Sequence, residues 1–244
     1  YPGCAPVRPA SKVLAESWLR IGEVHYDLDE LDPALEAYTE ATGNPDDPLH
    51  DEALIRVAWT LYLQRRFADA ATKLDEFVRY ADGRRGKEEA EGALALRDDA
   101  VRYIAKCYVE DDWDGDGGPD PVQGFARLDR DYGERGDERH VPEVYAALGD
   151  LMAVDSDFKQ AIMIYETALQ RWPLAAAAPK LQRKILEAYQ GLRDADGVLR
   201  SREALASNYI RGTKWFFANE AKPDVIEEAM KLVEEALVAA AVER

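Results

Sequence analysis

The segment 143–173 constrains the fold most, because it carries two apolar runs of helical spacing joined by a short polar break at 155–157. In each run the large apolar residues recur three and four positions apart, which places them on one face of a helix. The small residues Gly149, Ala161 and Ala168 fall on these faces and would let two antiparallel helices approach closely. One such hairpin cannot bury its apolar face alone, so the segment requires neighbours of the same kind.

Similar pairs of apolar runs occur along most of the chain. They predict units at about 13–46, 51–82, 88–132, 140–173 and 176–209. A glycine- and aspartate-rich insert at 111–120 interrupts the third unit, and the small-residue pattern is weaker in the fifth. The stretch 13–209 is therefore predicted to be a stack of about five helical hairpins.

The two ends of the chain differ from this repeated pattern. Residues 1–12 contain three prolines and predict an extended lead-in. At the other end, 210–244 predicts an aromatic connection followed by a terminal helix that caps the stack. Pro223 would be the first residue of that helix, with Asp224 in its opening turn. The fold class predicted for the whole chain is all-α.

The repeated units resemble the tetratricopeptide repeat family. Its pattern is a large apolar residue, leucine-glycine and tyrosine in the first helix, then alanine, an aromatic residue and alanine in the second, then proline. The first unit matches it with Trp18, Ile21, Gly22, His25, Ala34, Tyr38, Ala41 and Pro45. The fourth matches with Tyr145, Leu148, Gly149, Met152, Ala161, Tyr165, Ala168 and Pro173. Ala34 and Ala70 are 36 residues apart, close to the family's period of roughly 34. The resemblance implies a right-handed helical-hairpin solenoid.

Members of this family generally bind peptides or protein surfaces on a concave groove lined by the first helix of each unit. Carried over by position, the resemblance implies a partner-binding set of Glu23, Tyr26, Trp59, Tyr62, Arg102, Lys106 and Asp150. The alternative is that Trp59 and the tyrosines only pack between adjacent units. A clamp for a C-terminal carboxylate is not expected, because Arg102 and Lys106 are the only basic residues of the set.

Charge restricts the class of partner. The chain has 31 lysines and arginines against 48 acidic residues, a formal net charge of -17. Such a charge disfavours nucleic acid and anionic lipid surfaces as partners and favours a protein or peptide with a basic patch. The sequence also lacks an apolar run long enough to span a membrane.

The insert contains one candidate metal site. Asp112, Asp114, Asp116 and Asp120 alternate around glycines as at the start of a calcium loop, with Gly118 offering a carbonyl. The twelfth place holds Gln123 instead of a bidentate acid, and Pro119 stiffens the exit of the loop. The sequence leaves open a weak calcium site or a solvated loop without an ion.

Catalysis has little support in the sequence. The three histidines lie in separate units, and neither a nucleophile elbow nor a phosphate-binding glycine loop occurs. We therefore expect no enzymatic activity and no resident cofactor other than the possible calcium. Cys107 lies in an apolar helical run and is expected to be a buried free thiol.

The cellular location is suggested only by context. The acidic, alanine-rich units and the junction at 208–224 are similar to parts of large envelope-associated repeat proteins of Gram-negative bacteria. The chain begins at Tyr1 rather than methionine, as a processed or partial polypeptide would, so that a targeting signal would lie upstream. We expect a scaffold or adaptor in a larger assembly of the periplasm or cell envelope, with the cytoplasm as the alternative. The second candidate function is a calcium-dependent structural module.

Overall fold

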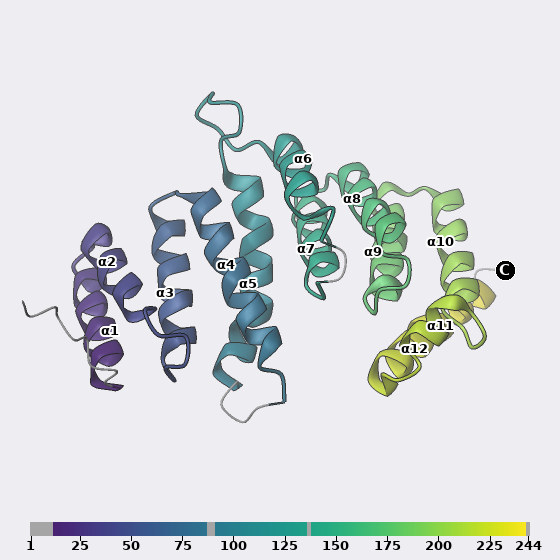
Figure 1. Ribbon diagram of the computed structural model, residues 1–244. Coiled ribbons are helices and arrows are strands. Elements are labelled where there is room, and N and C mark those ends of the chain that lie inside the picture. The colour runs from purple at the N-terminus through teal and green to yellow at the C-terminus, as the bar shows by residue number, and fades with distance from the viewer. Residues whose placement is uncertain (1–11, 87–90, 136–137, 243–244) are drawn as a thin grey trace, which may run out of the picture. The chain divides into compact units, whose positions relative to one another are not determined.

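A computed structural model of the chain describes residues 12–86, 91–135 and 138–242. Within these ranges every regular element is an α-helix (Figure 1), so the predicted all-α class of helical hairpins is confirmed. The lead-in predicted at 1–12 lies outside the described residues except for Lys12, and so does Cys4.

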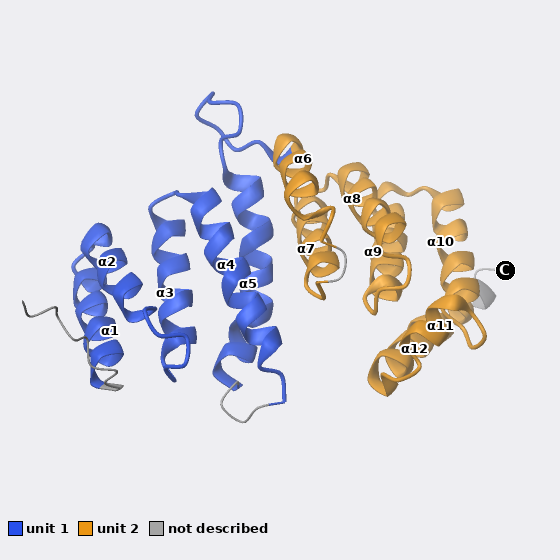
Figure 2. Ribbon diagram, viewed as in Figure 1, with its two compact units in different colours: residues 1–121 blue, residues 122–244 orange. Residues whose placement is uncertain are grey.

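The chain divides into two compact units, residues 1–121 and 122–244 (Figure 2). The first contains α1 (Lys12–Asp27), α2 (Leu31–Ala41), α3 (His50–Leu63), α4 (Phe67–Gly83) and α5 (Glu91–Glu110). The second contains α6 (Pro121–Tyr132) except for its first residue, α7 (Val141–Val154), α8 (Phe158–Arg171), α9 (Ala178–Leu192), α10 (Ala195–Asn208), α11 (Lys214–Asn219) and α12 (Pro223–Val242). The boundary follows the loop 111–120, and the grouping of the helices into five repeats stays a prediction.

Four hairpins contain the same tight turn, namely α1/α2, α3/α4, α7/α8 and α9/α10. Each has one residue with a left-handed backbone after its first helix: Asp29 (φ 61°), Arg65 (φ 58°), Ser156 (φ 65°) and Arg193 (φ 56°). The N–H of this turn residue donates to the carbonyl three residues earlier. The next N–H donates to the carbonyl five residues before it, and each of these bonds measures 2.9 or 3.0 Å. These bonds satisfy carbonyls at the end of the first helix.

A glycine and a tyrosine bring the two helices together in α1/α2 and in α7/α8. The ring of Tyr38 lies against Gly22, and the ring of Tyr165 lies against Gly149, so closely that a methyl group on either glycine would overlap the ring. Both tyrosines are buried. This contact confirms that small residues allow a close approach of the helices.

Stacking of one hairpin on the next builds the core of each unit. In unit 1, α2 packs on α3 and α4 packs on α5, while in unit 2, α8 packs on α9. The last helix, α12, packs on α10 and α9 through Ala229, Val233 and Ala236. The second helix of a hairpin therefore lies against the first helix of the next, as in a repeat array.

The predicted aromatic connection contains the short helix α11. Thr213 caps it by accepting a hydrogen bond from the N–H of Phe216 at 3.3 Å. Trp215 is buried, and its Nε1 donates to the carbonyl of Ala175 at 2.7 Å. The indole thus fixes this connection to the turn that precedes α9. Among the helices of the described ranges, none combines the length and the apolar character that crossing a membrane requires.

Candidate interaction surface

The residues predicted to bind a partner lie on four first helices. Glu23 and Tyr26 lie on α1, Trp59 and Tyr62 on α3, Arg102 and Lys106 on α5, and Asp150 on α7. The first six belong to unit 1, and Asp150 belongs to unit 2. We call the six residues in unit 1 the first-helix face. Whether any of the seven binds a partner stays a prediction.

Tyr62 is held in a polar and aromatic cluster between α3 and α5. Its hydroxyl donates to Oε2 of Glu110 at 2.5 Å. Its ring meets that of Tyr103 edge to face at a centroid distance of 5.1 Å and that of Phe67 at 5.3 Å. The ammonium of Lys106 lies 5.3 Å from the centroid of the Tyr62 ring. Tyr62 therefore joins two hairpins as well as facing solvent in part.

The electrostatics of this cluster keep both groups in their ordinary protonation states. Burial, followed by the hydrogen bond to Glu110, raises the pKa of Tyr62 to about 12. The hydrogen bond with Tyr62 raises the pKa of Lys106, and Glu110, whose Oε1 lies 3.3 Å from Nζ, raises it further. The tyrosine stays neutral and the lysine stays charged near pH 7, so the cluster offers no group poised for proton transfer.

Two further aromatic residues of the first-helix face are at least partly exposed. Tyr26 is 37% exposed on α1, and Trp59 is half-buried on α3. Aromatic residues are enriched among those that dominate binding at protein interfaces. Tyr62 is therefore tied into packing between hairpins, whereas Tyr26 is exposed and Trp59 is half-buried, and their role in binding stays a prediction.

Two acidic residues of the predicted set are ion-paired to the next hairpin. Glu23 on α1 lies 3.8 Å from Arg56 on α3. Asp150 on α7 accepts from Lys184 on α9 at 2.6 and 2.7 Å, and it also accepts from the hydroxyl of Tyr165 at 2.7 Å. These carboxylates are therefore part of the stacking of the hairpins.

The two ion pairs occupy the same positions of the repeat. Glu23 and Asp150 each lie six residues before the left-handed turn residue of their own hairpin. Arg56 and Lys184 each lie nine residues before the turn residue of the following hairpin. The repeat thus places an acid and a base side by side on successive first helices, a signal that an alignment of the units on their turns would have revealed.

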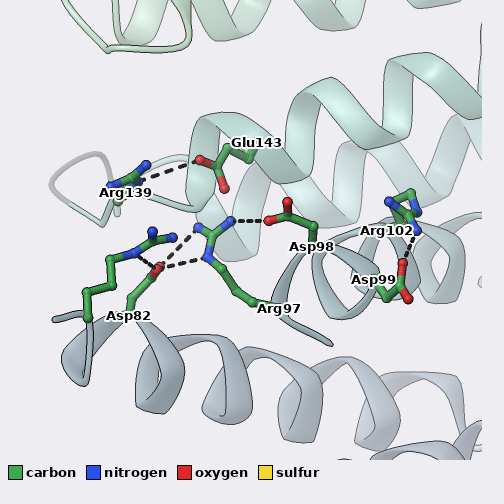
Figure 3. A network of polar contacts seen from close by, with 8 residues as sticks. Asp82, Arg97, Asp98, Asp99, Arg102, Arg139 and Glu143 are labelled. Atoms are coloured by element: carbon green, nitrogen blue, oxygen red, sulfur yellow. Dashed lines mark hydrogen bonds and ion pairs between the residues drawn. The ribbon is translucent and has the colours of Figure 1, made fainter. Parts of the chain in front are cut away.

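A second polar network in unit 1 was not predicted from the sequence (Figure 3). Arg97 of α5 is buried and donates to both carboxylate oxygens of Asp82 of α4, at 2.8 and 3.0 Å, and to Asp98 at 2.9 Å. Arg85 also donates to Asp82, at 2.8 Å. Burial raises the pKa of Asp82, but the hydrogen bonds and charges of Arg97 and Arg85 outweigh this effect and hold it below its ordinary value. Asp82 is therefore ionised and joins α4 to α5.

Arg102 of the predicted set is engaged within its own helix. It forms an ion pair with Asp99, also drawn in Figure 3. The same figure shows an ion pair of unit 2, Arg139 with Glu143, at 3.8 Å. Since Arg102 is exposed, its pairing with Asp99 costs little to exchange for a partner's carboxylate.

The loop 111–120 gathers three of the four predicted calcium ligands. Asp112, Asp114 and Asp116 each place one carboxylate oxygen within 4.8 Å of the others, and all three are exposed. Asp120 is outside this group, and its Oδ2 accepts from the N–H groups of Trp113 and Asp114 at 3.1 Å. Calcium binding stays a prediction.

Backbone hydrogen bonds show what these carboxylates do in the loop itself. Asp112 accepts from the N–H groups of Gly115, Asp116 and Gly117, at 2.7, 3.1 and 2.9 Å. Gly115 and Gly117 have φ values of 85° and 93°, which suit glycine. The indole of Trp113 anchors the loop to α5 by donating to the carbonyl of Tyr108 at 2.9 Å. Asp112 therefore helps to shape the loop through hydrogen bonds to its backbone.

Cys107 of α5 is a buried free thiol, as predicted. Burial raises the pKa of this thiol above its usual range. A thiol that is both enclosed and protonated is a poor nucleophile and a poor metal ligand.

Comparisons with known proteins give a coarse result. No family model matches the chain, and no curated protein matches it. Among solved structures, MamA is 16% identical with a TM-score of 0.35, over 88% of this chain and 96% of that chain. TTC0263, a tetratricopeptide repeat protein of Thermus thermophilus, is 19% identical with a TM-score of 0.31, over 90% and 98%. The TPR2AB domain of yeast Sti1, in a complex with pHSP90, is 14% identical with a TM-score of 0.25, over 93% and 99%.

Proposed function

We propose that the chain is a non-catalytic scaffold that binds another protein or a peptide on the first-helix face of unit 1. The observation that carries this proposal is the row of partly exposed aromatic side chains, Tyr26, Trp59 and Tyr62, on the successive first helices α1 and α3. Aromatic residues dominate the binding energy of protein interfaces because they bury a large area at a small entropic cost.

The neighbouring helices hold this face in place before a partner arrives. The ion pair of Glu23 with Arg56 joins α1 to α3, and the contact of Tyr62 with Tyr103 joins α3 to α5. A surface that is already ordered loses little conformational entropy on binding. The support for a basic partner is the net charge of -17, which attracts positively charged proteins over long distances.

The test compares baits that differ only on this face. Wild-type protein and a Tyr26→Ala/Trp59→Ala variant are immobilised, exposed to extract of the source organism, and the retained proteins are quantified by mass spectrometry. We expect the variant to lose specific partners while its circular dichroism spectrum stays helical. Tyr62 is left unchanged, because its hydrogen bond to Glu110 makes its replacement a change of stability as well.

Phe217→Ala provides the matched control, since Phe217 is an exposed aromatic residue of α11 in unit 2. This variant should retain the same partners as the wild type. Equal recovery of every partner by the wild type and by the Tyr26/Trp59 variant would remove the first-helix face as the binding site. Loss of binding as salt rises from about 0.05 to 0.5 M supports a basic partner, because exposed charges are screened over that range.

The assembly in which the scaffold acts is proposed to belong to the bacterial cell envelope. This proposal is supported by the acidic, alanine-rich units and the junction at 208–224. Fractionation of the source cells followed by immunoblotting tests it. Recovery of the protein only with cytosolic markers would contradict the envelope location.

A calcium-dependent structural module is the second candidate function. It is supported by the three carboxylate oxygens of Asp112, Asp114 and Asp116 that lie within 4.8 Å of one another. Calorimetric titration with calcium chloride should give heat and a raised melting temperature, and both should vanish in an Asp114→Asn/Asp116→Asn variant. A titration without heat would remove this candidate and would leave the first-helix face unaffected.

A further inference from the structure

A histidine is enclosed where the hairpin α1/α2 meets the hairpin α3/α4. His50, the first residue of α3, is only 6% exposed. The centroid of its ring lies 5.0 Å from that of Tyr80 on α4. A hydrogen bond joins the imidazole to the backbone of Thr42, the residue that follows α2. Since α2 packs on α3, the ring of His50 is part of the joint between the two hairpins.

One nitrogen of this ring has no partner. Nδ1 of His50 is buried without a hydrogen-bond partner among the described residues, so the bond to Thr42 uses Nε2. In the neutral ring Nε2 then carries the proton, and Nδ1 is a bare acceptor. A second proton would bind at Nδ1, where it would create both a buried charge and a donor without an acceptor. The joint therefore fits the neutral ring and not the imidazolium.

The charged groups around the ring do not remove this penalty. Glu76 of α4 and Asp51 of α3 favour a positive charge on His50, whereas Arg84, which follows α4, opposes it. Asp47, in the turn before α3, accepts a hydrogen bond from a backbone N–H of that turn at 3.0 Å. Burial is the largest effect and outweighs the carboxylates, so that the pKa of His50 is below its ordinary value.

We propose that His50 is a pH-sensitive switch whose protonation releases the first hairpin from the second. Opening of this joint separates α2 from α3. It also loosens α1 from α3, because α1 is held there through α2 and through the long ion pair of Glu23 with Arg56. These two helices carry Tyr26 and Trp59, so acid would disrupt the first-helix face. The switch acts on the stability of the joint and does not rest on the proposed scaffold function.

Acid favours the open joint because the open form binds more protons. A histidine of the unfolded chain titrates near about pH 6.5, and His50 in the closed joint has a lower pKa. Stability is therefore complete above the unfolded pKa and is lost as the pH falls below it. The equilibrium constant for opening should rise by up to about tenfold per pH unit below about pH 6.5, until His50 is protonated in the closed form as well.

Hydrogen exchange of the whole chain tests the switch. Exchange is followed by mass spectrometry at about pH 7.5 and about pH 5.5, on either side of the ordinary histidine pKa, and is corrected for the intrinsic rate of each amide. Peptides of α2 should lose up to about tenfold of their protection at the lower pH. Peptides of α10 in unit 2 should keep theirs.

His50→Phe keeps an aromatic ring at the buried place but cannot be protonated. Its α2 peptides should show the same protection at both pH values. His25→Gln is the matched control, because His25 is a half-buried histidine of α1 that pairs with Glu30 at 2.6 Å. This variant should respond to pH like the wild type. Equal loss of α2 protection in the wild type and in His50→Phe would overturn the proposal, and so would a wild type without any loss.

The titration of the ring itself distinguishes a switch from a histidine that only packs. NMR of the Cε1–H proton should give His50 a pKa below about 6.5. Arg84→Gln removes the opposing charge and should raise this pKa, which makes the loss of α2 protection smaller, whereas Glu76→Gln should lower the pKa. These two variants provide the test if His50→Phe does not fold. A pKa of His50 at or above about 6.5, or shifts of the opposite sign, would overturn the proposal.

Discussion

The hairpins α1/α2 and α7/α8 share one packing solution and differ in the polar group beside it. In both, a tyrosine ring of the second helix covers a glycine of the first, Tyr38 over Gly22 and Tyr165 over Gly149. In α7/α8 the hydroxyl of Tyr165 donates to Asp150. The hydroxyl of Tyr38 is buried without a hydrogen-bond partner among the described residues.

The length of one acidic side chain accounts for this difference. Glu23 occupies the place of Asp150 but is one methylene longer, and its carboxylate pairs with Arg20 at 2.8 Å and with Arg56 at 3.8 Å. Asp150 is short enough to accept from Tyr165 and from Lys184 at once. The glycine–tyrosine contact is therefore the same in the two hairpins, whereas the hydrogen bonds of the nearby acid differ. Overlap of atoms has a high energetic cost, while a partly exposed carboxylate can form ion pairs with different neighbours at little cost.

Replacing either glycine by alanine should give the largest loss of stability, because it removes the glycine–tyrosine contact that the two hairpins share. Gly22→Ala and Gly149→Ala each place a methyl group inside a tyrosine ring, and we expect a loss of about 1–3 kcal/mol in the free energy of unfolding. Urea denaturation measures it. Gly83→Ala is the control, since a methyl group there meets nothing within 4 Å, and it should be neutral or stabilise by up to roughly 1 kcal/mol. Equal effects at all three glycines would contradict the packing argument.

Replacing Asp150 should give the next largest loss of stability, and the loss should be confined to unit 2. Asp150→Ala leaves the buried hydroxyl of Tyr165 without its acceptor and frees Lys184, so we expect a loss of about 1–3 kcal/mol. Glu23→Ala in unit 1 should cost clearly less, because its ion pairs are long or solvent-exposed. Thermal unfolding of the two variants gives the comparison, and a larger loss for Glu23→Ala would show that the acids have the opposite roles.

Deleting each tyrosine hydroxyl isolates the difference between the hairpins. Tyr165→Phe removes a hydrogen bond and should cost about 0.5–1.5 kcal/mol, whereas Tyr38→Phe removes an unpaired buried hydroxyl and should be neutral or stabilising. Chemical denaturation provides the measurement. Glu23→Asp sharpens the test, since a shorter carboxylate at this place should make Tyr38→Phe costly in that background. The same cost for both tyrosines in the wild type would refute the assignment.

Replacing the turn residues should have the smallest effect and should not distinguish the hairpins. Asp29→Gly and Ser156→Gly relieve a left-handed backbone that glycine adopts freely, while glycine adds entropy to the unfolded chain. We expect a net stabilisation of roughly 0.5 kcal/mol for each. Melting temperatures measure it, with Thr72→Gly in the exposed middle of α4 as a control that should lower stability by up to about 1 kcal/mol.

Helical spacing was sufficient to predict the hairpins, whereas the turn geometry was not visible in the residue types. Local helix geometry decides which residues share a face, and the small residues such as Gly149 and Ala161 recur on these faces from one hairpin to the next. The four left-handed turn residues are an aspartate, a serine and two arginines, none of which is the glycine that normally marks such a turn. The helix α11, which Thr213 caps and which contains Trp215, was not predicted, because a helix of six residues is too short to show a helical spacing of apolar residues.

For the candidate surface, the sequence predicted which helices carry the residues but not which side chains these residues contact. The resemblance placed Tyr62 and Lys106 on first helices, where they lie. It could not show that the hydroxyl of Tyr62 donates to Glu110, 48 residues away, or that Arg97 of α5 donates to Asp82 of α4. Such pairs depend on how separate hairpins meet, and no periodic signal in the sequence records them.

The rate at which the buried thiol of Cys107 is alkylated can report local opening of α5. Burial keeps this sulfur protonated and out of reach of an alkylating reagent, so the reagent reacts only during moments when the helix opens. With Cys4 changed to serine, Cys107 is the sole sulfhydryl of the chain. Its labelling rate in native buffer then reports how often α5 opens, and a ligand bound to the first-helix face would slow the labelling without carrying a label of its own.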